Sequence, residues 1–119
     1  MKKLLELLDS TPEKIEFGQV IQVIEENYNY TPTHFTNGEG CDQVTNEAGS
    51  NEGSCKIFSF AQLNNLNEKQ TLACFGNYYR EDVLAHPDNT DHANIRNFIK
   101  SGWAGIHFDN IALIKKSDN

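Results

Sequence analysis

The sequence predicts a mainly α, compact single-domain bundle of about four or five helices over residues 1–119, with a long polar loop between the second and third helices. Apolar residues recur at helical spacing in several segments, and helix-start residues precede most of these segments. The chain has 119 residues, of which 38% are hydrophobic. A chain of this length and composition is sufficient for one hydrophobic core, so a single domain is expected.

The first two helices are predicted near the N-terminus. A cluster of leucines from Leu4 to Leu8 indicates a short first helix. Thr11 and Pro12 then have the residue types that start a helix, a cap followed by a proline at the first helical position. The second helix is expected over residues 12–27, because its apolar residues lie three and four apart: Phe17, Val20, Ile21 and Ile24.

Residues 27–53 are predicted to form a long polar connection rich in turn residues. A loop of this length without regular structure is unusual inside a compact domain. The connection is therefore expected either to be functional or to contain a short element around Phe35 or Val44.

The third helix is predicted from Ser54 through about Leu66, and its apolar residues cover most of its circumference. Such a helix is expected at the centre of the protein. Asn67 and Gln70 then have the spacing of a capping box, which starts a fourth helix that continues to Pro87. Gly76 lies in the middle of this helix, where close contact with a neighbouring helix would explain a glycine.

A last helix is predicted after a cap at Thr90 and Asp91, and Gly102 is expected to end it. Two apolar segments, residues 105–108 and 111–114, flank a two-residue turn, which favours a short C-terminal β-hairpin or irregular packing without a third strand. Asparagine occurs 14 times, and these residues are expected largely at caps and turns.

Charge and composition exclude several classes of function. The net charge of −7 and the presence of only two arginines argue against a nucleic-acid surface and against binding to anionic membranes. The acidity is expected to favour solubility, with a basic partner as the alternative. The three cysteines have no CxxC spacing and the four histidines are dispersed, so neither a metal site nor a cofactor is predicted. A reducing compartment, the bacterial cytoplasm, is the expected location.

Cys55 is the strongest candidate for a catalytic residue. If Ser54 is the cap, Cys55 is the first residue of a helix, where the helix dipole and Lys56 would lower the pKa of its thiol. A nucleophilic cysteine also needs a base, for which His34 and His92 are candidates. The alternative is that Cys55 is a small structural residue at the start of a buried helix.

The candidate ligand-binding residues fall into two groups. The helix-start backbone at Asn51 and Ser54 is suited to an anion, although its glycine spacing is not that of a P-loop. The second group combines both guanidinium groups of the chain with polar residues near the last helix: Arg80, Asp91, His92 and Arg96. The alternative is that the arginines form internal ion pairs with Asp82 or Asp91. Trp103 is similarly either a partner-binding residue or a core residue at a helix end.

Several long motifs resemble the HopJ family. They lie within residues 33–38, 46–58, 71–84, 91–98 and 102–106. The resemblance extends from about Leu4 to Leu113. It implies a type III effector, a bacterial protein injected into a host cell, and brings no enzymatic activity, cofactor or functional residue with it.

The leading functional hypothesis is a non-enzymatic binding or interaction protein of the HopJ type, with an unknown protein or small molecule as its partner. Its surface is expected in the loop of residues 37–53, near Cys55, Arg80 and His92. The alternative is a small enzyme with Cys55 as nucleophile. The oligomeric state stays open.

Overall fold

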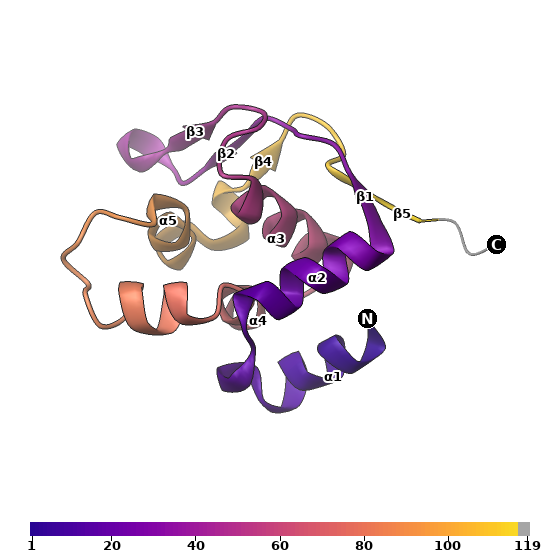
Figure 1. Ribbon diagram of the computed structural model, residues 1–119. Helices are drawn as coiled ribbons and strands as arrows, with labels where there is room; N and C mark the ends of the chain where they lie inside the picture. Colours follow the sequence, from indigo (N-terminus) through magenta and orange to yellow (C-terminus); the bar gives the residue numbers. More distant parts are fainter. Residues whose placement is uncertain (117–119) are drawn as a thin grey trace.

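A central helix organises the fold, which the computed structural model describes for residues 1–116 (Figure 1). This helix is α3 (Glu52–Leu63), and its buried residues include Cys55, Ile57 and Phe58. The aromatic ring of Phe58 lies 5.1 to 6.3 Å, centroid to centroid, from the rings of Phe75, Phe98, Trp103 and Phe35. The prediction of a buried central helix is therefore confirmed, although the helix begins before Ser54 and ends at Leu63, not at about Leu66.

Two small antiparallel sheets accompany the helices, so the protein is mixed α/β and not the helical bundle predicted above. In one sheet, β1 (Tyr28–Tyr30) pairs with β5 (Leu113–Lys115). In the other, β2 (Phe35–Asn37) lies between β3 (Val44–Asn46) and β4 (His107–Phe108). The short elements expected around Phe35 and Val44 are thus present. A 3-10 turn, η2 (Gly40–Asp42), connects β2 to β3.

The predicted C-terminal hairpin is wrong. Its two apolar segments are strands, but they belong to different sheets, β4 beside β2 and β5 beside β1. The backbone N–H and C=O groups that pair with β4 and β5 belong to the connection between α2 and α3. Local turn chemistry at residues 109–110 carries no information about these distant partners.

The short first helix is present as predicted, whereas the second helix begins later than predicted. Helix α1 spans Lys2–Ser10, and its buried residues Leu4 and Leu8 face the core. The proline expected at the start of the second helix begins a 3-10 turn instead, η1 (Pro12–Lys14). Ile15 and Glu16 are extended, and α2 spans Phe17–Asn27.

The helix predicted from Asn67 to Pro87 is interrupted. The capping box is confirmed, because the Asn67 side chain accepts from the Gln70 amide at 2.7 Å, and α4 (Glu68–Ala73) follows it. Gly76 then has a φ of +59°, which breaks the helix. The chain resumes as a π-helix, η3 (Tyr78–Val83).

The last helix, α5 (Ala93–Ser101), begins after His92 and not after a cap at Thr90 or Asp91. Gly102 ends it, as predicted, with a φ of +59°. A 3-10 turn, η4 (Gly102–Gly105), leads into β4.

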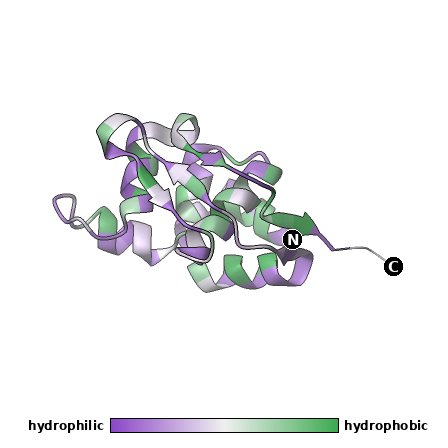
Figure 2. Ribbon diagram, turned by 90° about the horizontal axis from the view of Figure 1, so that it is seen from above, coloured by the Kyte–Doolittle hydropathy of each residue, from purple (hydrophilic) through white to green (hydrophobic). Residues whose placement is uncertain are grey.

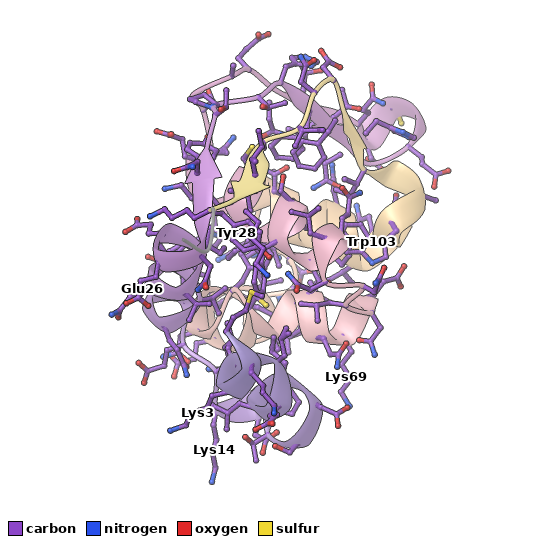
Figure 3. All side chains as sticks on the ribbon, turned by 90° about the vertical axis from the view of Figure 1, so that its right-hand side faces the viewer. Lys3, Lys14, Glu26, Tyr28, Lys69 and Trp103 are labelled. Carbon is purple, nitrogen blue, oxygen red and sulfur yellow. The ribbon has the colours of Figure 1, made fainter. Side chains whose placement is uncertain are left out.

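Hydrophobic and hydrophilic residues alternate along the helices (Figure 2). Lys3, Lys14 and Lys69 extend away from the body of the protein, whereas Tyr28 lies within it (Figure 3). Among the described helices, none combines the length and the apolar character that crossing a bilayer requires.

Candidate functional site

The first turns of α3 and α5 open into one cleft with a volume of about 420 Å³. Asn51, Gly53 and Ser54 line it from the start of α3. His92 and the first three residues of α5 line it from the other side: Ala93, Asn94 and Ile95. Aromatic side chains and one residue of β3 complete the walls: Phe17, Phe75, Tyr78 and Val44. The cleft thus has a polar end and an apolar wall.

Both helices begin at a residue in the left-handed conformation. Asn51 has φ and ψ of 50° and 48°, and His92 has 52° and 48°. Neither side chain makes a hydrogen bond to the first turn of its helix. Ser54 is therefore the third residue of α3 and not its cap, which corrects the sequence prediction. The amides of both first turns lie at the cleft without a side-chain cap.

A network of asparagines adjoins the cleft, which two of its members, Asn51 and Asn94, line directly. Asn37 and Asn46 are fully buried, and both donate to Asn94 Oδ1, at 3.0 and 3.1 Å. Asn94 Nδ2 donates in turn to Asn46 Oδ1 at 2.8 Å, and Asn51 Nδ2 donates to the same oxygen at 2.8 Å. This network fixes β2, β3 and both helix starts relative to one another.

Sequence reasoning missed the role of these asparagines, because it placed them at caps and turns. A signal existed in the sequence: Asn37 and Asn46 each end a segment with strand character, one after Phe35 and the other after Val44. Asparagine is uncommon within strands, so its presence there indicates a bonded side chain.

The aromatic wall is held by the π-helix. Tyr78 packs edge-on against Phe17, with ring centroids 5.1 Å apart, and its ring lies 5.3 Å from that of His92. Asp82, one turn further along, lies with its Oδ2 3.0 Å from His92 Nε2. The π-helix therefore positions both the ring and the carboxylate that orient His92.

The two arginines do not line the cleft. Arg80 donates to the carbonyl oxygens of Ile15 at 2.6 Å and Pro12 at 3.4 Å, which joins the π-helix to the segment before α2. Arg96 donates to the Asp91 carboxylate at 2.7 Å, so the internal ion pair that was the alternative reading is present. This pair lowers the pKa of Asp91, mainly through the hydrogen bond from Arg96.

Arg96 also donates to the backbone carbonyl oxygens of Asp91 at 2.6 Å and His86 at 2.9 Å. The guanidinium therefore closes the loop that precedes α5. Of the predicted ligand-binding residues, the structure brings Asn51, Ser54 and His92 together and places Arg80, Asp91 and Arg96 elsewhere.

Cys55 is buried and does not line the cleft. It is 1% exposed, and its Sγ lies 3.7 Å from the carbonyl oxygen of Thr33. Burial raises the pKa of its thiol, which overturns the expectation of a lowered pKa at a helix start. Cys55 is the fourth residue of α3, one turn inside the helix, so desolvation outweighs the dipole.

The two candidate bases are each paired with a carboxylate. His34 Nδ1 lies 2.9 Å from Asp109 Oδ2, and His92 pairs with Asp82 as described. Within residues 1–116, no three His, Cys, Asp or Glu side chains gather closely enough to hold a metal ion.

Trp103 is half-buried and packs against the core at a helix end. Its ring lies 5.0 Å from that of Phe98, and its indole nitrogen donates to the Leu66 carbonyl oxygen at 3.2 Å. These contacts agree with the second of the two alternatives for Trp103, a core residue at a helix end.

Comparisons with known proteins point to one family. The family model described as "HopJ type III effector protein" matches residues 1–113. A solved structure described as "Crystal structure of unknown function protein VPA0580" is similar to this chain, with a TM-score of 0.93. It shares 54% sequence identity, and the match covers 98% of this chain and 93% of that one. No curated protein matches this chain.

Proposed function

The chain belongs to the HopJ type III effector protein family, and we propose that it is a non-enzymatic binding protein whose ligand occupies the cleft between α3 and α5. The observation that carries this proposal is the convergence of Asn51, Ser54 and His92 on one cleft. These residues come from segments about forty positions apart, yet each was identified from the sequence as a candidate for ligand binding.

The composition of the cleft supports this role. Ligand sites are typically apolar hollows with a few fixed polar groups, and this one has aromatic walls with polar groups at one end. Its polar groups are held in place: Asn94 and Asn51 by the asparagine network, and His92 by Asp82. A ligand would therefore meet preorganised donors, which reduces the cost of binding.

Binding can be tested by NMR on the ¹⁵N-labelled protein. Anionic, neutral and cationic fragments are titrated separately, and the expected result is a set of shifts centred on the amides of Gly53, Ser54 and Asn94. His92→Asn, which keeps a residue type that tolerates positive φ, is expected to weaken these shifts at least about threefold.

The matched control is His86→Asn, because His86 is exposed and does not line the cleft. Equal weakening by the two substitutions, or shifts that avoid the cleft with every fragment class, would contradict the proposal.

The family description supports a second part of the proposal, that the protein is delivered by a type III secretion system and binds its partner in the host cell. A translocation reporter fused to the C-terminus of the whole chain tests delivery. The reporter signal in host cells is expected from a secreting strain and lost when the secretion ATPase is deleted. An equal signal from both strains, or none from either, overturns the delivery role and leaves binding to be judged by the NMR experiment.

A further inference from the structure

A second groove adjoins the cleft, and we infer that it takes the cationic side chain of a basic partner peptide. This inference rests on the proposed binding function and identifies the class of partner. The groove has a volume of about 520 Å³, and it is lined by Glu16, Phe17, Gly18, Asn77, Tyr78 and Asp82. Phe17 and Tyr78 also line the cleft, so the two hollows form one continuous surface.

The aromatic part of the groove is suited to a cation. Tyr78 is 45% exposed, and its ring packs edge-on against Phe17. Lysine and arginine are attracted to an exposed aromatic face, and arginine also stacks on it. A rigid, exposed ring is a common feature of partner-binding surfaces.

The charge of the groove has one sign. Among the described residues that line it, Glu16 and Asp82 are the charged ones, and both are acidic. Glu16 is exposed, and the Asp82 side chain is 48% exposed although one of its oxygens faces His92. Arg80 is not among the lining residues; its guanidinium donates to the carbonyl oxygens of Pro12 and Ile15 and, at 3.4 Å, to Asn77 Oδ1 at the edge of the groove.

Carboxylates that line a groove together with an aromatic ring are complementary to a guanidinium or ammonium group, which pairs with a carboxylate while its stem covers the ring. The net charge of −7 adds a long-range attraction for a basic peptide. An acidic peptide would be repelled by the carboxylates of the groove and by the net charge of the protein. Charge complementarity therefore favours a basic partner.

The walls of the groove are also built to stay in place. A Cβ on Gly76 would lie 2.7 Å from the backbone nitrogen of Phe17, so the absence of a side chain there lets the segment before the π-helix touch the start of α2. Arg80 joins the same two segments through its bonds to Pro12 and Ile15. Phe17 and Tyr78 are therefore held at a fixed separation.

The test is fluorescence anisotropy with a fluorescein-labelled peptide of alternating arginine and glycine. The comparison peptide carries citrulline in place of arginine, which keeps the shape and removes the charge. The double variant Glu16→Gln/Asp82→Asn is expected to weaken binding of the arginine peptide about tenfold. Tyr78→Leu, which keeps an apolar side chain, is expected to weaken it about fivefold.

The matched control is Asp9→Asn/Glu26→Gln, which removes the same charge from exposed positions on α1 and α2 outside the groove. It is expected to change binding less than twofold, as is typical of charges outside a contact. Circular dichroism and urea midpoints establish that every variant is folded.

Equal weakening by the two double variants would show diffuse attraction and overturn the inference, as would equal binding of the citrulline peptide. If fragments shift the cleft amides but the arginine peptide does not bind, the inference fails and the proposed function stands. If neither binds, both fail.

Discussion

Asn46 and Asn94 exchange two side-chain hydrogen bonds, one in each direction. Asn46 Nδ2 donates to Asn94 Oδ1 at 3.1 Å, and Asn94 Nδ2 donates to Asn46 Oδ1 at 2.8 Å. Both residues are buried, and they join the edge strand β3 to the first turn of α5. Because Asn94 also lines the cleft, the pair connects the stability of the fold with the shape of the candidate site.

We expect Asn94→Ala to lower the free energy of unfolding by about 2–4 kcal/mol, because it removes both bonds of the buried pair and leaves the Asn46 amide without its acceptor. The Asn37 amide keeps its bond to the backbone carbonyl oxygen of residue 94. Urea denaturation measures this change. The control is Asn89→Ala in the exposed loop before α5, for which a change within about 0.5 kcal/mol is expected. A loss below about 1 kcal/mol for Asn94→Ala would contradict the structural role of the network.

Two glycines should respond oppositely to alanine. Gly76→Ala is expected to destabilise the protein by more than about 2 kcal/mol, because φ is +59° and the new Cβ would lie 2.7 Å from Phe17 N. Gly18→Ala is expected to stabilise it by up to about 1 kcal/mol, because Gly18 lies inside α2 and its Cβ would meet nothing within 4 Å. Thermal unfolding of both variants checks the difference, and a stable Gly76→Ala protein would mean that the helix break is not needed.

The helical part of the fold was largely predictable, because its signals are local. The stripe on α2, the apolar α3 and the capping box at Asn67 depend on residues a few positions apart. The break at Gly76 was not predictable, since it is decided by contact with Phe17, a residue far away in the sequence. The pairing of β4 with β2 and of β5 with β1 is non-local for the same reason.

The candidate site likewise combines features with local sequence signals and features that depend on distant contacts. Asn51, Ser54 and His92 were found because helix starts have a sequence signature, and two such starts meet at one cleft. The internal roles of Arg80 and Arg96 depend on carbonyl oxygens of Pro12, Ile15 and His86, for which residue types give no warning. The acidic groove at Phe17 and Tyr78 joins two distant segments and was likewise outside the reach of sequence patterns.

The three thiols should differ sharply in reactivity. Cys41 is exposed, whereas Cys55 and Cys74 are buried. With a thiol-specific chromogenic disulfide at pH 8, we expect one thiol to react at once and the other two only as the protein unfolds. Cys41→Ala should abolish the fast phase. A fast phase that persists in this variant and disappears in Cys55→Ala would instead support a reactive Cys55 and the enzymatic alternative.

Alkaline pH should destabilise the protein through Cys74. Burial raises the pKa of this thiol from 9.0 to about 12. Above about pH 9 the unfolded chain releases the thiol proton while the folded protein retains it, so the unfolded state binds fewer protons and the free energy of unfolding falls as pH rises. One such thiol contributes a slope of at most about 1.4 kcal/mol per pH unit.

Urea denaturation between pH 8.5 and 10.5 should therefore show a shallower decline in the free energy of unfolding for Cys74→Ala than for the wild type. Cys41→Ala should follow the wild type, because Cys41 is exposed. Parallel declines in all three proteins would show that the Cys74 thiol does not keep its proton in the folded state.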